Sequence, residues 1–333
     1  MHRPLTIVAL AASGLFAFAS TATAETITVC ANGCDHTSIN DAIDASSNGD
    51  VIQLAAETYF EGEVINTDGK AITLRGVLNK AGEPASVLDG ASDHRVLVCA
   101  SDETDATSFE NLVIQNGDAS SLFGDNDDGG GMYNVNNSNP SLTNCKFTGN
   151  SAADYGGGMF NAGSSPTLTN CVFTNNSADY GGGMHNTPSL FSSNPTLTDC
   201  TFTGNSADDA GGGMYNVESS SPTLTNCTFT SNSAEKRGGG MYSENSSTLA
   251  LNNCTFTSNS AGKNGGGMYN FSTRPTLTDC AFTGNSADEF GGGMYNASSN
   301  PTLINCTFTT NSADIRGGGM HNDVCSPILT GCE

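Results

Sequence analysis

Basic residues are scarce in this sequence of 333 residues, which has 11 Lys and Arg against 34 Asp and Glu. A protein that holds nucleic acid needs Lys and Arg to neutralise the phosphates, so we expect no nucleic acid among its partners. Once Arg3 is removed with the export signal described next, 10 basic and 34 acidic residues leave a net charge of −24. That balance suits a surface outside the cell, where calcium is a possible but not a required ligand.

Long apolar runs are also missing, apart from the one that spans Leu5 to Ala19. Arg3 precedes this run, and Ala22-Thr23-Ala24 follows it as a cleavage site of small residues, which predicts a signal peptide over residues 1–24. The run is short for a membrane span, and no second candidate follows it. We therefore expect an exported protein, secreted or held at the outer membrane or cell surface, with no transmembrane segment after the signal peptide.

Helix-type periodicity is weak in the rest of the chain, where one stretch of residues recurs instead. It consists of Leu197 to Ala207 followed by Gly211 to Asn216, and the methionines of successive copies are 27, 25, 30, 27, 27, 26 and 26 residues apart. A fixed period of roughly 20–50 residues indicates a solenoid. The methionines are Met132, Met159, Met184, Met214, Met241, Met268, Met294 and Met320.

Each copy predicts three short strands, Gly-Met-Tyr-Asn, Thr-Leu-Thr and Cys-x-Phe-Thr, because apolar residues alternate in them. The residue between the last two strands is of a type that tolerates positive φ, which predicts a sharp bend there. The predicted bend residues are Asn144, Asn170, Asp199, Asn226, Asn253, Asp279, Asn305 and Gly331. The glycine triplets predict a corner with no room for a Cβ atom.

A second recurring asparagine predicts an internal hydrogen-bonded ladder between stacked coils. Its members are Asn150, Asn176, Asn205, Asn232, Asn259, Asn285 and Asn311. With Leu, Cys, Phe and Met pointing inward, the repeats predict an all-β fold, a single-stranded right-handed parallel β-helix with about 26 residues per coil. Residues 125–333 hold eight copies, of which the last is incomplete and has no cap at the C-terminus, an edge open to docking or aggregation.

Residues 25–124 lack the period and are expected to form an N-terminal cap and irregular first coils. Ser38 to Ala45 predicts a helix whose Ile39, Ala42 and Ile43 cover the open end of the stack. Strands are expected over Thr26–Cys30, Asp50–Leu54, Ile72–Gly76, Ser86–Gly90, Arg95–Cys99 and Phe109–Gln115.

Several of these segments carry a resemblance to known families. Ser38 to Ala45, Gly49 to Leu54, Glu57 to Tyr59 and Ile72 to Gly76 resemble the opening coils of the pectin lyase-like β-helix superfamily. The later copies resemble the polymorphic outer membrane protein repeats of chlamydial surface proteins, which pair Gly-Gly-Ala-aliphatic with Phe-x-x-Asn. The second element is matched, as in Phe202 to Asn205, and the first is Gly-Gly-Gly-Met here. The superfamily implies the fold, but it includes lyases, hydrolases, esterases and adhesins.

The main candidate for a binding face is the residue that follows each repeat methionine. If methionine points inward, these side chains point outward and stack along the solenoid as a platform for sugars or a partner surface. The alternative is that the stacked rings only stabilise their sheet. The candidate residues are Tyr133, Phe160, His185, Tyr215, Tyr242, Tyr269, Tyr295 and His321.

Cysteine and acidic residues supply weaker candidates. Cys30 and Cys34 lie close together in an exported chain and are expected to form a disulfide, whereas the repeat cysteines are expected to stay as free, buried thiols. Asp125, Asp127 and Asp128 resemble part of a calcium loop, although the Glu of an EF-hand is missing and a solvated loop is the alternative.

Catalytic patterns of the superfamily are missing as well. There is no Arg-x-Pro-x-x-Arg, no Asp-Phe-Ile-Phe-Gly, and no Asp-Asp pair on an expected strand. We therefore expect a non-catalytic surface or secreted protein that binds a glycan or a cell-surface partner, as an adhesin does. The alternative is a pectate lyase-like enzyme, a polysaccharide lyase or glycoside hydrolase, with its site in the irregular coils before Gly129.

Overall fold

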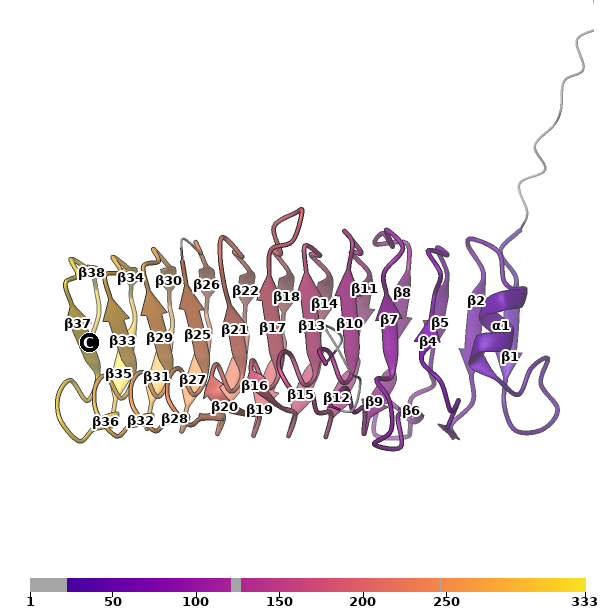
Figure 1. Cartoon of the computed structure of the whole chain (residues 1–333), viewed down its shortest axis with the longest axis horizontal. Helices are drawn as coiled ribbons and strands as arrows, with labels where there is room; N and C mark the ends of the chain where they lie inside the picture. The colour runs from indigo at the N-terminus through magenta and orange to yellow at the C-terminus, as the bar shows by residue number, and fades with distance from the viewer. Residues whose placement is uncertain (1–22, 121–126, 246) are drawn as a thin grey trace, which may run out of the picture.

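The chain forms an elongated stack of parallel coils. The computed structural model describes residues 23–120, 127–245 and 247–333. The strands of each coil pair in parallel with the equivalent strands of the next coil, and the coils follow one another from the N-terminal helix to the C-terminus (Figure 1). The predicted parallel β-helix is confirmed, and the same sheets run through the irregular and the regular coils without a break.

The first sheet carries an inward-pointing leucine in most coils, and we call it the leucine sheet. Its 12 strands are β1 (Thr26–Val29), β2 (Val51–Leu54), β5 (Thr73–Arg75), β8 (Ser108–Glu110), β11 (Ser141–Thr143), β14 (Thr167–Thr169), β18 (Thr196–Thr198), β22 (Thr223–Thr225), β26 (Ala250–Asn252), β30 (Thr276–Thr278), β34 (Thr302–Ile304) and β38 (Ile328–Thr330). Threonines flank the leucine in most of them because alternate residues face solvent.

The second sheet, the phenylalanine sheet, follows the bend. Its 10 strands are β3 (Thr58–Tyr59), β6 (Ser86–Asp89), β9 (Leu112–Gln115), β12 (Lys146–Thr148), β15 (Val172–Thr174), β19 (Thr201–Thr203), β23 (Thr228–Thr230), β27 (Thr255–Thr257), β31 (Ala281–Thr283) and β35 (Thr307–Thr309). From Phe147 to Phe308 the rings stack with centroids 4.7–4.8 Å apart. Their stack forms one wall of the core.

The third sheet, the methionine sheet, follows the glycine triplets. Its 10 strands are β4 (Ile65–Asn66), β7 (Leu97–Cys99), β10 (Met132–Val135), β13 (Met159–Ala162), β17 (Met184–Thr187), β21 (Met214–Asn216), β25 (Met241–Glu244), β29 (Met268–Phe271), β33 (Met294–Ala297) and β37 (Met320–Asp323). The methionines join the leucines, cysteines and phenylalanines in one continuous apolar core.

A fourth sheet, the alanine sheet, was not predicted. Its six strands are β16 (Ser177–Tyr180), β20 (Ser206–Ala210), β24 (Ser233–Ala234), β28 (Ser260–Ala261), β32 (Ser286–Ala287) and β36 (Ser312–Ala313). The prediction of three strands per coil is therefore wrong for the coils that carry it. Four of these strands are only two residues long, too short to show the alternation from which strands are recognised.

The bend between the leucine and phenylalanine sheets is confirmed at every predicted position. The eight bend residues have φ between 52° and 65°. Asn111, with φ 56°, makes the same bend one coil earlier and divides Phe109–Gln115 into β8 and β9. The expectation of a single strand there is therefore wrong, because an asparagine in the left-handed region ends a strand.

The N-terminal end is covered by helix α1 (Ile39–Ala45), as predicted. Ser38 caps the helix by accepting a hydrogen bond from the Asp41 amide, and Ile39, Ala42 and Ile43 are buried. The helix packs against β1, β2 and β4 and so closes the first coil. The disulfide between Cys30 and Cys34 lies in the adjacent loop, and that prediction is confirmed.

Candidate functional site

The aromatic residues that follow the repeat methionines form one continuous stack. Neighbouring ring centroids from Tyr133 to His321 lie 4.7–5.5 Å apart. The eight residues are paired in register along the methionine sheet, which places the rings above one another. The stacking that the sequence predicted is therefore present, and we call these eight residues the aromatic column.

The expectation that this column stands exposed is wrong for most of its length. Its six central residues expose only 3–8% of their surface, and these are Phe160, His185, Tyr215, Tyr242, Tyr269 and Tyr295. The four tyrosines among them pack in a satellite core beside the main one. Whether the column binds a ligand stays a prediction, but the faces of these rings do not form an open platform.

The cover comes from the residue just before each glycine triplet, which the sequence analysis missed. These residues bridge in parallel from coil to coil and include Tyr155, Tyr180, Ala210, Arg237, Asn264, Phe290 and Arg316. The Tyr155 ring lies 4.6 Å from that of His185, the Tyr180 ring lies 5.3 Å from that of Tyr215, and the Phe290 ring lies 4.9 Å from that of His321. The signal was available, because this position carries an aromatic residue or arginine in most copies.

A groove of about 410 Å³ opens where the cover is incomplete, over the first coils of the aromatic column. We call it the aromatic groove. Tyr155 and Tyr180 form one wall, the residues of β13, β17 and β21 form the floor, and carboxylates lie at the margins. Its lining residues are Asp128, Tyr155, Phe160, Tyr180, His185, Thr187, Tyr215, Val217, Glu218 and Glu244.

Glu244 is held in place by two phenols of the aromatic column. The Tyr215 hydroxyl donates to Glu244 Oε1 at 3.0 Å, and the Tyr242 hydroxyl donates to Oε2 at 2.9 Å. Burial, reinforced by the Glu244 charge, raises the pKa of Tyr215 and of Tyr242 well above the ordinary value. Both phenols therefore remain protonated donors, and Glu244 is a fixed acceptor at the edge of the groove.

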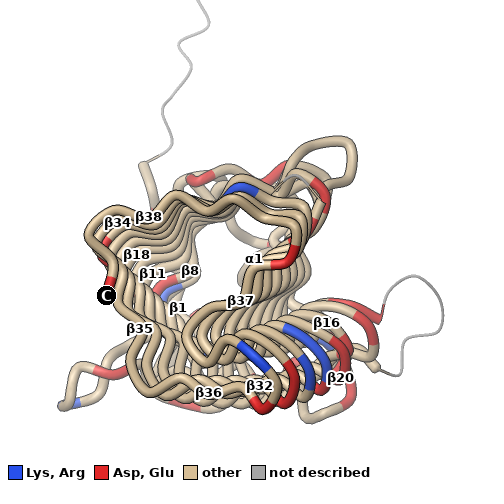
Figure 2. The backbone as a smooth tube through the Cα atoms, turned by 90° about the vertical axis from the view of Figure 1, so that its left-hand side faces the viewer, with Lys and Arg blue, Asp and Glu red and all other residues tan. Residues whose placement is uncertain are grey.

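Acidic residues surround the groove. Burial and the neighbouring Asp154 raise the pKa of Asp128 to about 7, against an ordinary value of 3.8. Burial together with nearby carboxylates, Asp154 at Tyr155 and Asp209 at Tyr180, also raises the pKa of these two wall phenols. Figure 2 shows acidic residues gathered along the edge of the solenoid that carries β16 and β20.

His185 is the buried histidine of the groove. It exposes 3% of its surface, and its Nδ1 has no hydrogen-bond partner within the described part of the chain. Burial lowers the pKa of this imidazole to about 3, so the ring is neutral in the folded state at physiological pH.

Acid is therefore expected to destabilise the wild-type protein through His185. Below the ordinary pKa of 6.5 the unfolded chain takes up a proton that the folded chain binds only near pH 3, so stability falls as the pH drops through this window. At pH 4.5 the loss is on the order of 2 kcal/mol. Thermal unfolding of His185→Phe at pH 7.5 and 4.5 should show a smaller pH dependence than the wild type. The control His321→Phe changes a less buried ring of the same column, and an equal effect there would contradict this explanation.

Of the three predicted calcium residues, Asp128 lines this groove. Asp125 falls outside the described residues, and Asp127 and Asp128 lie just before Gly129. The backbone carbonyl of Asp127 accepts from the amide of Ala153, which anchors the segment to the next coil. Among the described residues, no three His, Cys, Asp or Glu side chains converge as metal ligands. Calcium binding stays a prediction.

An Asp-Asp pair does lie on a strand, contrary to the expectation from sequence. Asp208 and Asp209 belong to β20, which was not predicted because the alanine sheet was not. Lys236 of the next coil forms an ion pair with Asp209. One member of the pair is therefore already neutralised by a neighbour, whereas a catalytic carboxylate must be free to exchange a proton.

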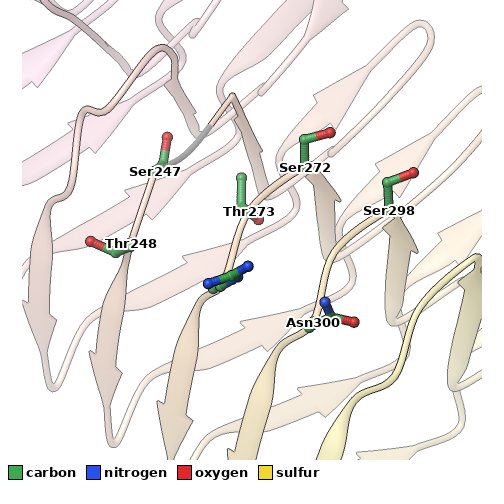
Figure 3. A pocket seen from close by; sticks show the side chains of 7 residues that line it. Ser247, Thr248, Ser272, Thr273, Ser298 and Asn300 are labelled. Atoms are coloured by element: carbon green, nitrogen blue, oxygen red, sulfur yellow. The ribbon is translucent and has the colours of Figure 1, made fainter.

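Two other hollows lie on the solenoid. One, of about 360 Å³, is lined by short polar side chains and Arg274 at successive turns (Figure 3). The other, of about 450 Å³, lies between the loop at Gly82 to Pro84 and strands β9, β12 and β15. Among its described lining residues, only Glu83 and Lys146 are charged. It reaches into the irregular coils, where the enzyme alternative placed an active site.

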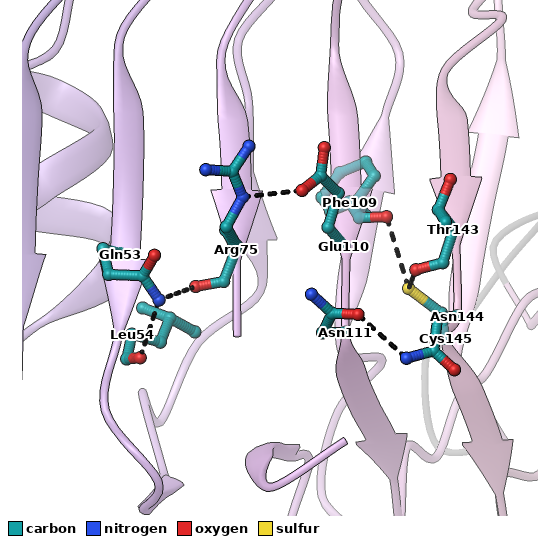
Figure 4. A network of polar contacts seen from close by, with 9 residues as sticks. All are labelled: Gln53, Leu54, Arg75, Phe109, Glu110, Asn111, Thr143, Asn144 and Cys145. Carbon is teal, nitrogen blue, oxygen red and sulfur yellow. Dashed lines mark hydrogen bonds and ion pairs between the residues drawn. The ribbon is translucent and has the colours of Figure 1, made fainter. Parts of the chain in front are cut away.

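The polar network of the early coils holds the leucine sheet together. Arg75 Nε donates to Glu110 at 2.6 Å, and the two residues are paired in register on β5 and β8 (Figure 4). Asn144 donates to Asn111 at 2.8 Å, which links successive bends. These contacts run from coil to coil along the axis, so we interpret them as structural.

The repeat cysteines are free, as predicted, and all of them except Cys332 are buried. Their thiols lie against backbone carbonyls, as in the 3.7 Å contact of Cys227 Sγ with the Leu197 carbonyl oxygen. Burial raises the pKa of Cys171 well above the ordinary value. Thiolate is the reactive form of cysteine, so burial suppresses the reactivity of Cys171.

These coils define the class of protein as a β-helix solenoid, and the comparisons with known proteins agree. A family model described as a right-handed β-helix region matches residues 91–235 and 192–333. The matches cover well over half of the chain, which therefore belongs to this family. No curated protein matches the sequence.

Solved structures show the same architecture. Pectate lyase Pel9A is similar with a TM-score of 0.51 and 12% identity, over 91% of this chain and 80% of that one. A pectin methylesterase from carrot has a TM-score of 0.47 and 10% identity, over 92% and 90%. PfbA, a surface adhesin of Streptococcus pneumoniae, has a TM-score of 0.33 and 10% identity, over 88% and 87%. At these identities the likeness shows the fold alone, and the fold agrees with the right-handed β-helix that the pectin lyase-like resemblance implied.

Two expectations remain open. The likeness to polymorphic outer membrane protein repeats stays a prediction. The signal peptide lies almost wholly in residues 1–22, outside the described residues, and so stays a prediction as well. No helix in the described part of the chain is long and apolar enough to cross a membrane.

Proposed function

We propose that this chain is an exported, non-catalytic β-helix protein that binds glycans of a surface or matrix through the aromatic groove. The observation that carries the proposal is the meeting of aromatic rings and carboxylates in one groove of the solenoid. Sugars present apolar C–H faces, which pack against aromatic rings, and hydroxyls, which donate to acceptors such as Glu244.

The rigidity of the groove also supports binding. Its floor consists of strands paired on both sides, and Glu244 is fixed by two phenols. A preformed site of this kind loses little conformational entropy when a ligand binds. The paired strands of the methionine sheet would therefore hold the groove at a fixed position along the solenoid.

A polysaccharide-degrading enzyme is the second candidate, favoured by Asp128 and Asp154. A carboxyl whose pKa is about 7 next to a second carboxylate is the kind of pair that serves as general acid and base. The fold is compatible with this alternative, since pectate lyase Pel9A has the same architecture. Asp128→Asn separates the two candidates, because it should abolish cleavage but leave non-catalytic binding largely unchanged.

The proposed function is tested by a glycan array with the mature protein. Tyr155→Ala and Tyr180→Ala remove the two wall rings and should weaken binding about tenfold each. Phe60→Ala removes an exposed ring far from the groove and is the matched control, since Phe60 exposes 65% of its surface. Thermal unfolding would show that all three variants fold.

Three outcomes would contradict the proposal. Binding that is unaffected by both wall substitutions would place the site elsewhere. The absence of any glycan ligand would remove the proposed function. Cleavage of a bound polysaccharide, seen as new unsaturated or reducing ends and lost in Asp128→Asn, would make the protein an enzyme.

A further inference from the structure

We propose that the aromatic groove selects glycans that carry free, positively charged amino groups and disfavours polyuronates. The inference rests on the proposed function and names the ligand class of the same site. It is argued from the charges of the lining, from the rings, and from how the nearby basic residues are engaged.

The groove is acidic and has no basic residue in its described lining. Glu218 and Glu244 line it, together with aromatic and small residues and with Asp128, whose pKa of about 7 leaves it mostly protonated at pH 6. Asp154 and Asp179 lie close enough to act on the phenols of its wall. An ammonium group on a sugar would be attracted by this field, whereas a chain of carboxylates would be repelled.

The rings of the groove favour the same ligand. A cation is attracted to the face of an aromatic ring within about 6 Å of its centroid, most strongly when both are shielded from water. The described chain uses this contact twice on the aromatic column, with Arg95 over Tyr133 at 4.4 Å and Arg237 over Tyr269 at 5.9 Å. Around Phe160 and His185, between these two places, no such arginine contact is present among the described residues.

His185 gives an independent sign that the groove is built for a polar ligand. Its Nδ1 is buried in the lining and has no partner among the described residues, although buried polar atoms are nearly always paired. The ring is neutral, so it adds no positive charge that would oppose an ammonium group. A bound amine or hydroxyl, or a water that it holds, can complete the hydrogen bonding there.

The basic residues nearest to the groove are already engaged. Lys236 is paired with Asp209, and Arg95 lies over Tyr133 near Asp127 and Asp128. Neither residue lines the groove. A polyuronate would therefore meet carboxylates without compensating cations, and it would need a bridging metal ion to bind.

The test uses two oligosaccharides with the same backbone, one with free, charged amino groups and one with neutral, acetylated ones. A hexamer of β-1,4-linked glucosamine and the same hexamer fully N-acetylated are titrated into the mature protein by calorimetry at pH 6. We expect the amino form to bind at least about tenfold more tightly. Raising the salt from about 0.1 M to about 1 M shortens the Debye length to about 3 Å and should remove most of this preference. Polygalacturonate, with and without calcium, is the opposing probe.

Charge-neutralising variants locate the effect. Glu218→Gln and Asp179→Asn should each weaken binding of the amino hexamer about threefold to tenfold and leave the acetylated hexamer unaffected. Asp279→Asn is the matched control: it removes one charge at a bend where other coils carry asparagine, as at Asn226 and Asn253. This control should bind both hexamers as the wild type does.

The failure of this inference differs from the failure of the proposed function. Equal binding of both hexamers, or tighter binding of polygalacturonate without calcium, would overturn the charge selectivity and leave a glycan site in place. If neither hexamer binds and the wall variants change binding of another, neutral glycan, the inference is also overturned while the groove stands. If no glycan on the array binds at all, the proposed function fails and this inference fails with it.

Discussion

Gly212→Ala should be among the most damaging single substitutions in this protein, with a loss of about 3 kcal/mol or more in the free energy of unfolding. A Cβ atom at Gly212 would lie 2.1 Å from the carbonyl oxygen of Ser233 and 2.6 Å from that of Gly239. Both atoms belong to the backbone of the next coil, so no side chain can move aside. The two coils would have to separate, and the bond from the Gly213 amide to the Gly239 carbonyl, at 3.1 Å, would weaken with them.

Gly284→Ala is the matched control for this prediction. Gly284 has φ +64°, but a Cβ there would meet nothing closer than 3.7 Å. The cost is therefore limited to the left-handed conformation, about 1–2 kcal/mol. Urea unfolding followed by circular dichroism measures both variants. Equal losses would show that the approach of the coils is not what requires glycine in the triplet.

The second large effect is expected for Asn232→Ala, with a loss of about 3–5 kcal/mol. Asn232 Oδ1 accepts from the amide and the side chain of Asn205, at 3.0 and 2.9 Å. Its Nδ2 donates to the Phe202 carbonyl and to Asn259 Oδ1, both at 2.9 Å. The substitution would remove these four buried hydrogen bonds and leave the Asn205 amide without an acceptor, and no water can reach a fully buried site of this kind without opening the coil.

Asn226→Gly serves as the control for the ladder. Asn226 is in the same coil, at the bend, and its Nδ2 donates to Asp199 at 2.9 Å in an exposed position. Glycine adopts the required positive φ and water replaces the lost partner, so the change should cost less than about 1 kcal/mol. Thermal unfolding compares the two variants, and similar losses would contradict a special role for the buried ladder.

A second ladder of buried asparagines is present that the sequence analysis did not predict. On the methionine sheet, buried asparagines donate from Nδ2 to the Oδ1 of the next coil at 2.8–2.9 Å, as from Asn161 to Asn186 and from Asn270 to Asn296. These residues follow the aromatic column in the repeat and were visible as Met-Tyr-Asn. Their role was missed because these asparagines face inward, on the same side of the strand as the methionines. An apolar core suggests apolar residues at such inward positions.

The sequence by itself determined the coil. Its constraints act within one repeat or between identical positions of stacked repeats. They are visible in the spacing of methionines and cysteines, in the asparagine or aspartate at most bends, and in the glycine triplets. Such constraints are local in a solenoid, because each coil contacts only its neighbours. The register of the sheets, the free buried thiols and the internal ladder at Asn232 could therefore be predicted from residue types and their period.

Only the tertiary structure decided what is exposed. Tyr215 and Tyr242 were expected to form an open face because they alternate with a buried methionine, but they lie beneath residues that precede the glycine triplets. Alternation assigns a side chain to one side of a strand, and whether that side meets water depends on how the neighbouring turn folds back. The same fold-back places Asp128 and His185 in one groove, although they come from different positions of the repeat.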